Sequence, residues 1–158
     1  MESREENGDI RKRLYKDKPL AGISLNEFEK PGTDYMTNLR RFCISLGVIS
    51  PGESRVGIVH ILDLLLKTRK KNPDGLDSYA IIKELYQKDV KIVYANILRD
   101  LRKLIAVGVV ERRENKYRIK ENMKLHELLD AFIRPYIIER IISRVGEYAN
   151  KIDEQLDL

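Results

Sequence analysis

The chain has 158 residues, of which 42% are hydrophobic and 35% are charged, with 30 Lys and Arg against 25 Asp and Glu. This length allows one domain with appendages or two very small domains. The single cysteine, Cys43, excludes an intrachain disulfide bond. We see no signal peptide and no run of about 18 to 20 apolar residues, so we expect a cytoplasmic protein without a membrane span. Scarce Gln with abundant Ile, Lys and Glu is typical of thermophile proteins.

Residues 1–32 form a polar segment with seven acids, seven bases and few large apolar side chains. Such a segment buries too little apolar surface to offset chain entropy, so we predict a flexible arm. Two interpretations remain open for its basic cluster, a solvated tail or an arm in the minor groove of DNA. The cluster comprises Arg11, Lys12, Arg13, Lys16 and Lys18. Some apolar residues could pack on the domain or on a partner, namely Leu20, Ile23, Leu25 and Phe28.

Two helices are predicted between residues 33 and 72. The first begins at an N-cap, Thr33, and ends at Gly47, with an apolar stripe at helical spacing. This stripe comprises Met36, Leu39, Cys43 and Leu46, with Phe42 beside it. The second helix runs from about Ser54 to Lys71 and is apolar on most sides, so we expect it to be central and buried. His60 lies in this helix without partners at metal-ligand spacing and is interpreted as a core histidine.

A break at residues 72–75 precedes a further pair of helices. Asp77 or Ser78 is expected to cap a helix of about ten residues that fades at residues 87–89. Its predicted apolar stripe holds Tyr79, Ile82, Leu85 and Tyr86, widened by Ile81. The next helix is predicted at about 91–107 and ends at Gly108. We expect its buried face to comprise Val93, Tyr94, Ile97, Leu98, Leu101, Leu104 and Ile105.

The positive charge of the chain is concentrated in residues 91–120, which hold nine Lys or Arg and three acids. The net charge of this segment is therefore +6, in a chain whose total is +5. On the outer face of the helix, small residues alternate with Asn96, Arg99, Arg102 and Lys103, and Asp100 is expected to one side. Arg can pair with guanine and Asn with adenine, whereas an ordinary solvated helix face also carries such residues. The uneven charge favours duplex DNA as the partner.

A short β-hairpin is predicted at residues 109–120, with Glu114-Asn115 at its turn because Asn tolerates positive φ. Its cations are expected to contact phosphates rather than bases, because so short a hairpin has limited reach. The candidate DNA-contacting residues are Lys91, Asn96, Arg99, Arg102, Lys103, Arg112, Arg113, Lys116 and Arg118.

The pattern Leu101-x-x-Leu104-x-x-x-Gly108-x-Val110, followed by Arg112 and a hairpin, resembles MarR-type and PadR-type winged helix-turn-helix regulators. The run Ile92-x-x-Ala95-Asn96-Ile97-Leu98-Arg99-x-Leu101-x-x-Leu104 is similar to the ferric-uptake-regulator family, in which the matching Arg faces DNA. The resemblance covers residues 54–121 and implies a winged-helix domain at 33–122. This chain lacks the His, Cys and acid clusters of the ferric-uptake regulators, so we expect no metal.

Residues 123–158 predict a long helix that Pro135 kinks or restarts. Beyond Pro135, apolar residues recur at the alternating four- and three-residue spacing of a coiled-coil seam. The seam comprises Ile138, Ile142, Val145, Ala149, Ile152 and Leu156, widened by Ile141 and Tyr148. Folding back onto the domain is one alternative, and homodimerisation is favoured because long-helix winged regulators resemble this layout. From residue 121 onward the net charge is −3, so contact with DNA is not expected here.

The sequence thus predicts a mainly α protein with a small β-hairpin, a winged helix-turn-helix domain and a C-terminal dimerisation helix. The expected function is that of a dimeric, sequence-specific, double-stranded-DNA-binding transcription regulator. The alternative is a winged-helix module that binds an acidic protein partner in a transcription or replication assembly. No catalytic constellation or cofactor motif is apparent. MarR-type proteins often hold small ligands near the dimer junction, where Phe132, Tyr136 and Tyr148 could line a pocket or simply pack.

Overall fold

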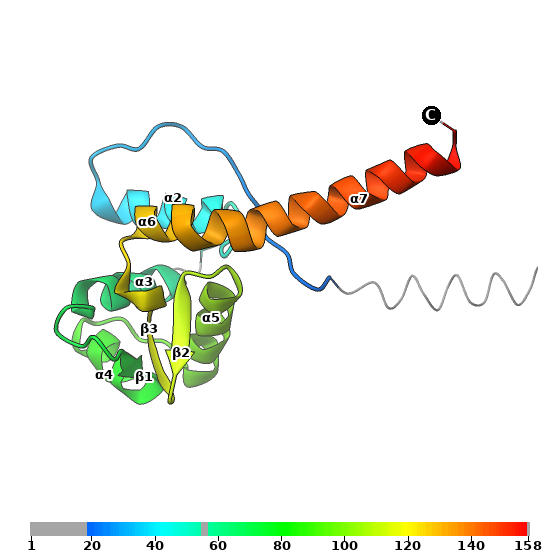
Figure 1. The fold of residues 1–158 in the computed structure, drawn as a ribbon. Helices are drawn as coiled ribbons and strands as arrows, with labels where there is room; N and C mark the ends of the chain where they lie inside the picture. Colours follow the sequence, from blue (N-terminus) through cyan, green and yellow to red (C-terminus); the bar gives the residue numbers. More distant parts are fainter. Residues whose placement is uncertain (1–18, 55–56, 158) are drawn as a thin grey trace, which may run out of the picture.

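The computed structural model describes residues 19–54 and 57–157, and it is mainly helical with a small antiparallel sheet (Figure 1). This agrees with the predicted fold class at that level. Among the described residues, helices α2 to α5 precede the hairpin, and a long helical arm follows it. The order is α2 (Tyr35–Ser45), α3 (Gly57–Thr68), β1 (Leu76–Asp77), α4 (Ser78–Gln87), α5 (Tyr94–Ala106), β2 (Val110–Arg113), β3 (Lys116–Ile119), η1 (Lys120–Asn122), α6 (Leu125–Leu128), η2 (Leu129–Ile138) and α7 (Glu139–Gln155).

Helix α2 is capped by Asp34 rather than by the predicted Thr33. Asp34 Oδ2 accepts hydrogen bonds from the Thr37 backbone N–H at 2.8 Å and from the Thr37 hydroxyl at 2.6 Å, which lower the pKa of Asp34. The carboxylate satisfies an N–H group that the helix start leaves without a partner. The helix ends before Gly47, as predicted, and Leu39, Cys43 and Leu46 are buried. Burial raises the pKa of the Cys43 thiol to about 12, so it is an inert core residue.

Helix α3 is the centre of the core and contacts α2, α4, α5 and β3. It is shorter than the predicted range from Ser54 to Lys71, since Ser54 precedes the helix and Lys71 lies in the turn after it. Five consecutive residues from Ile61 to Leu65 are buried. The polar one, Asp63, accepts a hydrogen bond from the Tyr35 hydroxyl at 2.7 Å and pairs with Lys67 at 3.0 Å, which compensates its burial.

The sheet has three strands in the order β1-β3-β2, and all neighbours are antiparallel. The hairpin of β2 and β3 was predicted, and Glu114 and Asn115 at its turn both have positive φ. Strand β1 was not predicted, because it has only two residues and forms by pairing with the distant Tyr117 and Lys116. Gly75 makes this possible: its φ is +93°, and a Cβ there would lie 2.4 Å from the Tyr117 carbonyl oxygen.

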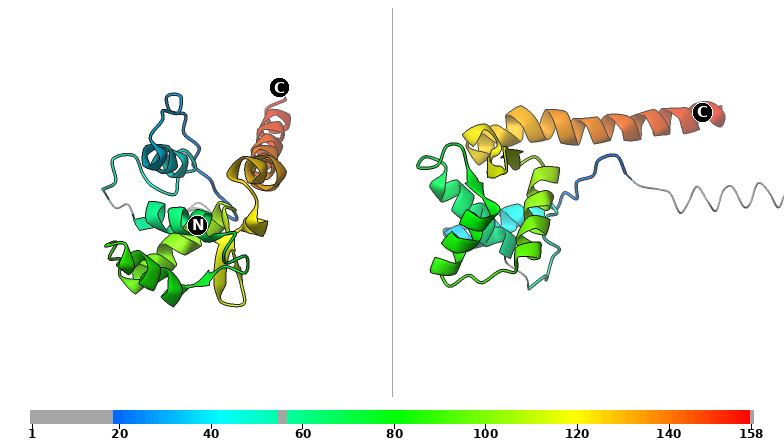
Figure 2. Two further views of the ribbon diagram at one scale, coloured as in Figure 1. Left: turned by 90° about the vertical axis from the view of Figure 1, so that its left-hand side faces the viewer. Right: turned by 90° about the horizontal axis from the view of Figure 1, so that it is seen from below.

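The C-terminal segment is one continuous helical arm that leaves the domain and carries α7 away from it (Figures 1 and 2). The predicted restart at Pro135 is therefore wrong, and the irregularity at this proline is a local change of helix type. Pro135 lies inside η2, a π-helix, and the Glu139 N–H donates to the Arg134 carbonyl five residues earlier. This wider turn accommodates the missing proline donor without a break. Leu128 and Ile133 are fully buried, so the beginning of the arm belongs to the same core as the helices before it.

Part of the predicted N-terminal arm lies against the domain. Residues 1–18, with the basic cluster at 11–18, lie outside the described residues. Ile23 and Phe28 pack against the core, and the Asn26 N–H donates to the Ser45 carbonyl at 3.0 Å. Leu20 and Leu25 remain exposed. No helix in the described part of the chain is both long enough and apolar enough to cross a membrane.

Candidate nucleic-acid interface

Helix α5 presents the predicted outer face to solvent. Ile97, Leu101 and Leu104 are buried against the core. On the other side Arg102 and Lys103 are exposed, next to the small residues Ala95 and Ala106. Asn96 and Arg99, also predicted for this face, are half-buried. Lys91 is exposed but precedes the helix, and its Nζ lies 5.5 Å from the centre of the Tyr86 ring. The helix therefore offers a cationic surface whose centre is formed by Arg102 and Lys103.

Arg99 is partly compensated within the protein. Its Nε lies 3.6 Å from Oδ1 of Asp100, a residue that is only 7% exposed rather than at the side of the outer face as expected. Burial raises the pKa of Asp100, although the cations of Arg99 and Lys103 oppose that shift. Within the described residues, Arg99 Nε has no hydrogen-bond partner. Attraction to Asp100 therefore restrains Arg99 near its Nε atom. The pairing reduces the positive charge that Arg99 adds to the surface.

The wing, which we define as β2, β3 and their turn, carries Arg112, Arg113 and Lys116 as exposed cations. The Arg112 guanidinium donates a hydrogen bond to the Asn115 side-chain oxygen and lies 5.8 Å from the Tyr117 ring centre. These contacts stiffen Arg112 against the turn. The wing tip lies at the end of the molecule opposite α2 (Figure 1).

Arg118 differs from the other wing cations because it is a structural residue. Its side chain is only 15% exposed, and its Nε donates to Glu111 Oε1 at 2.7 Å. Its Nη1 also donates to the Pro73 carbonyl at 3.1 Å, which ties the wing to the loop before β1. Burial alone would raise the pKa of Glu111, but the Glu121 N–H and Arg118 hold it below its ordinary value. Phosphate contact is expected for Arg118 from the sequence, but its Nε and Nη1 already donate within the fold, which reduces what it can offer a phosphate.

Two tyrosines expected in the core are instead on the surface beside the wing. Tyr79 is 72% exposed and Tyr94 38% exposed, and their rings stack with centres 5.3 Å apart. Tyr94 lies at the side of α5 rather than in the middle of its buried face, and Val93, also expected there, is exposed before the helix begins. Tyr86 is exposed as well. A helical wheel gives only the direction in which each side chain leaves the helix axis. The neighbouring elements decide how far around the helix burial extends.

These tyrosines border a groove of ≈ 560 Å³ between α5, the start of α4 and the wing. Arg102 lines the groove from α5 and Arg112 from the wing. The groove thus combines exposed aromatic rings with two guanidinium groups, which sequence periodicity could not bring together because the residues lie on separate elements. A polyanionic backbone would meet cations from both walls.

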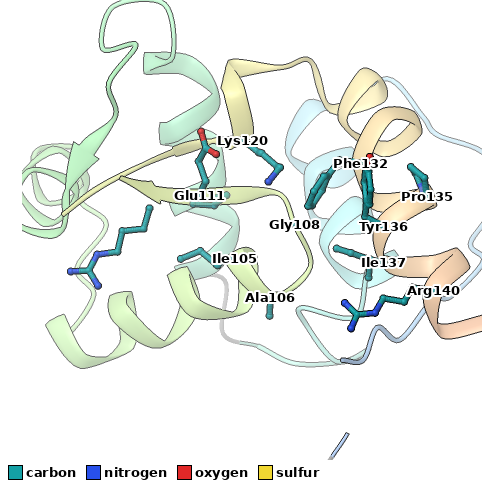
Figure 3. A pocket seen from close by; sticks show the side chains of 12 residues that line it. Ile105, Ala106, Gly108, Glu111, Lys120, Phe132, Pro135, Tyr136, Ile137 and Arg140 are labelled. Carbon is teal, nitrogen blue, oxygen red and sulfur yellow. The ribbon is translucent and has the colours of Figure 1, made fainter. Parts of the chain in front are cut away.

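A larger cavity of ≈ 690 Å³ lies between the wing, the end of α5 and η2 (Figure 3). Phe132 and Tyr136 line it with ring centres 5.4 Å apart, and Lys120 Nζ lies 3.6 Å from the Phe132 ring centre. Tyr148 does not line this cavity. In residues 19–54 and 57–157, no group of three or more His, Cys, Asp or Glu is placed to hold a metal ion.

Most side chains of the predicted coiled-coil seam on the C-terminal arm are exposed to solvent. Ile138 packs partly against the core, whereas Ile142, Val145, Ile152 and Leu156 are 53–64% exposed and Ala149 is also exposed. The alternative in which α7 folds back onto its own domain is not what the described residues adopt (Figure 2).

The chain matches no protein-family model, and it shows no significant similarity to curated proteins or to solved structures.

Proposed function

We propose that this chain is a double-stranded-DNA-binding protein of the winged helix-turn-helix type, acting as a homodimeric transcription regulator. What supports the proposal is that Arg102 of helix α5 and Arg112 of the wing line the same groove, with further exposed cations on both elements. A helix pair, α4 and α5, followed by a β-hairpin is the layout of the winged regulators that the sequence resembles. The protein acts by binding, and the proposal assigns it no catalytic step.

Ion pairs within the protein neutralise only part of the positive charge on this surface. Arg99 is paired with Asp100, and Arg118 with Glu111. Exposed cations remain on both elements, namely Arg102, Lys103, Arg112, Arg113 and Lys116, with Lys91 just before α5 and Glu114 as an exposed acid at the turn. An excess of cations on a helix and a neighbouring hairpin is suited to the phosphate backbone, which supplies most of the affinity of non-specific binding.

In this proposal α5 enters the major groove and the wing contacts the backbone. Arg102 and Lys103 lie at the centre of the exposed helix face, between Ala95 and Ala106, whose small side chains allow close approach to base edges. Arg112 and Lys116 contact phosphates, and Asn96 and Arg99 reach bases only at the edge of the face. Arg118 is removed from the set of DNA contacts.

The proposal is tested by selecting bound sequences from a random pool of duplexes. Enrichment of a two-fold symmetric site, with half-sites one helical turn or ~34 Å apart, is the expected result for a dimer. A pool that shows no enrichment, together with no duplex retention at low salt, contradicts the proposal. If a protein partner is then captured in stoichiometric amount, the surface serves as a protein-interaction module instead.

A further inference from the structure

Helix α7 carries an unusual amount of exposed apolar surface. None of its 17 residues is buried, and the stripe of Ile142, Val145, Ala149, Ile152 and Leu156 runs along one side. Tyr148, beside the stripe, is 66% exposed. A helix with one apolar side is stable in water when another surface covers that side.

The chain itself does not provide that cover within its described residues. Pro19, Leu20 and Ala21 line a cavity of ≈ 320 Å³ with Ile141, Val145 and Tyr148. Leu20 is nevertheless 91% exposed, so this stretch extends the apolar surface without covering it. Ile142, Ala149, Ile152 and Leu156 do not line this cavity.

The spacing of the stripe identifies the kind of partner. Apolar residues alternate at four and three residues from Ile138 to Leu156, which is the pattern of a helix that pairs with another helix of the same kind. A second copy of this chain offers the same length, the same stripe and the same spacing. We therefore take the second copy as the occupant.

The two flanks of the stripe differ in charge, and this difference selects the direction of pairing. One flank carries Glu139 and Asp153, with Gly146 between them at seven-residue spacing. The other carries Ile141, Tyr148 and Gln155 at the same spacing, with Arg144 and Lys151 next to them. The described ion pairs of α7 join Arg144 to Glu147 and Lys151 to Glu154, all at least 59% exposed, and involve neither Glu139 nor Asp153.

In an antiparallel pair, equivalent flanks meet, because the flank beside the seam of one helix faces the same flank of the other. Full overlap of the stripes then places Glu139 beside Asp153 of the second copy, twice over, and like charges are repelled. In a parallel pair, unlike flanks meet. The acidic flank then faces the flank of Ile141, Tyr148 and Gln155 of the second copy, which carries no acid, so the repulsion is avoided and the Tyr148 hydroxyl can donate to Asp153.

We infer that α7 pairs in parallel with α7 of a second copy, through the stripe of Ile142 to Leu156, with the acidic flank of each helix against the Tyr148 flank of the other. The inference rests on the homodimer in the proposed function and adds its direction. Because α7 is ~25 Å long at 1.5 Å per residue, antiparallel pairing would separate the two domains along a rod. Parallel pairing places both cationic surfaces at the same end, where one duplex can reach them.

Disulfide trapping tests the direction. Ile142→Cys and Ile152→Cys are made separately in the full chain, whose native Cys43 is fully buried. A parallel pair brings each new cysteine beside its own copy, so each variant alone forms a crosslinked dimer on mild oxidation, while the wild type does not. An antiparallel pair holds equivalent cysteines ~15 Å apart, too far for a disulfide. In that case only a mixture of the two variants crosslinks, and that result overturns the inference.

Sedimentation equilibrium tests the pairing itself. The wild type is expected to be a dimer, Ile142→Glu a monomer, and Ser143→Glu, which lies off the stripe, a dimer. A monomeric wild type, or equal behaviour of the two Glu variants, overturns the pairing. Duplex binding is measured on the same samples. A parallel dimer that binds no duplex refutes the proposed DNA-binding function and leaves the inference standing.

Discussion

At the scale of single residues, the candidate interface separates cations that are free to bind from cations that hold the fold. Arg102 and Arg118 illustrate the difference. Arg102 is exposed on α5 and lines the groove toward the wing, whereas Arg118 Nε and Nη1 donate to Glu111 and to the Pro73 carbonyl. Net charge alone therefore overstates the available positive charge, and substitutions at these two arginines are expected to have different consequences.

Arg102→Ala is expected to weaken binding to the selected duplex by ~1–3 kcal/mol, because it removes a charged group from the centre of the helix face. Thermal unfolding should be nearly unchanged, since Arg102 is exposed. Fluorescence anisotropy titrations compare this variant with Arg41→Ala, whose side chain pairs with Glu29 on the α2 side of the molecule. An Arg102 variant that binds as tightly as the Arg41 variant would place the contact surface elsewhere.

Glu111→Gln is expected to lower the free energy of unfolding by about 1–2 kcal/mol at neutral pH, since Arg118 loses a charged partner. The folded-state pKa of Glu111 lies below its ordinary value of 4.5, so its carboxylate stabilises the fold above that pH. That contribution is lost as the pH falls through the folded-state pKa. The difference between wild type and variant in urea unfolding should therefore shrink below pH 4.5, and a difference independent of pH would exclude the ion pair as its cause.

At the scale of elements, the wing and α5 have separate tasks. Lys116→Ala on the wing is expected to weaken binding to all duplexes alike, because a phosphate contact carries no sequence information. The slope of log affinity against log salt should become shallower by about 1. Titrations of matched and scrambled duplexes at several salt concentrations measure both quantities. Loss of affinity for the matched duplex alone would mean that Lys116 contacts bases.

The junction between α5 and the wing depends on Gly108. Its φ is +82°, and a Cβ there would lie 2.8 Å from Ile137 Cδ1 and 2.9 Å from Phe132 Cε1. Gly108→Ala is expected to destabilise the fold by more than the ~1–2 kcal/mol of a left-handed alanine. Gly52→Ala is the matched control, because Gly52 has a φ of +80° with no neighbour within 4 Å. Equal losses in denaturant unfolding would show that crowding against η2 contributes nothing.

Local chemistry made several of these elements predictable. Asp77 caps α4 as expected, accepting from the Ala80 N–H at 2.7 Å, and Glu114-Asn115 forms the turn between β2 and β3. Long-range contacts were not predictable. The two-residue strand β1 depends on a partner forty residues away, and the surface positions of Tyr79 and Tyr94 depend on how far the core covers α4 and α5. The π-helix around Pro135 could likewise be recognised only from the backbone hydrogen bonds of the structure.

The candidate site was predictable in outline because charge is visible in sequence. The exposed set on α5 and the wing lies where helical and strand periodicity placed it. Ion pairs reduce the set of cations that are free to bind. Asp100, the neighbour of Arg99 in sequence, is buried and pairs with it, and Glu111 pairs with Arg118 across the hairpin. Which cations are compensated is a property of tertiary packing, so a helical wheel cannot assign it.

At the scale of the whole molecule, the two functions proposed for this chain lie on different parts of it. The helix–wing segment 91–120 has a net charge of +6, and the segment from residue 121 onward has −3. The latter carries the apolar stripe on an arm that leaves the domain (Figure 2). Substitutions on α5 and the wing can therefore test DNA binding without altering the apolar stripe that the proposed self-association uses.

The most direct test of the central claim is a salt-dependent titration of a mixed-sequence duplex with two charge-matched double variants. Arg102→Ala with Lys116→Ala removes two cations from the α5–wing surface, and Lys30→Ala with Arg41→Ala removes two exposed cations near α2. The account predicts that the wild type binds at low salt. It also predicts that the first variant loses about tenfold or more in affinity with a salt slope shallower by about 2, while the second matches the wild type. No binding by the wild type, or equal losses in both variants, would contradict it.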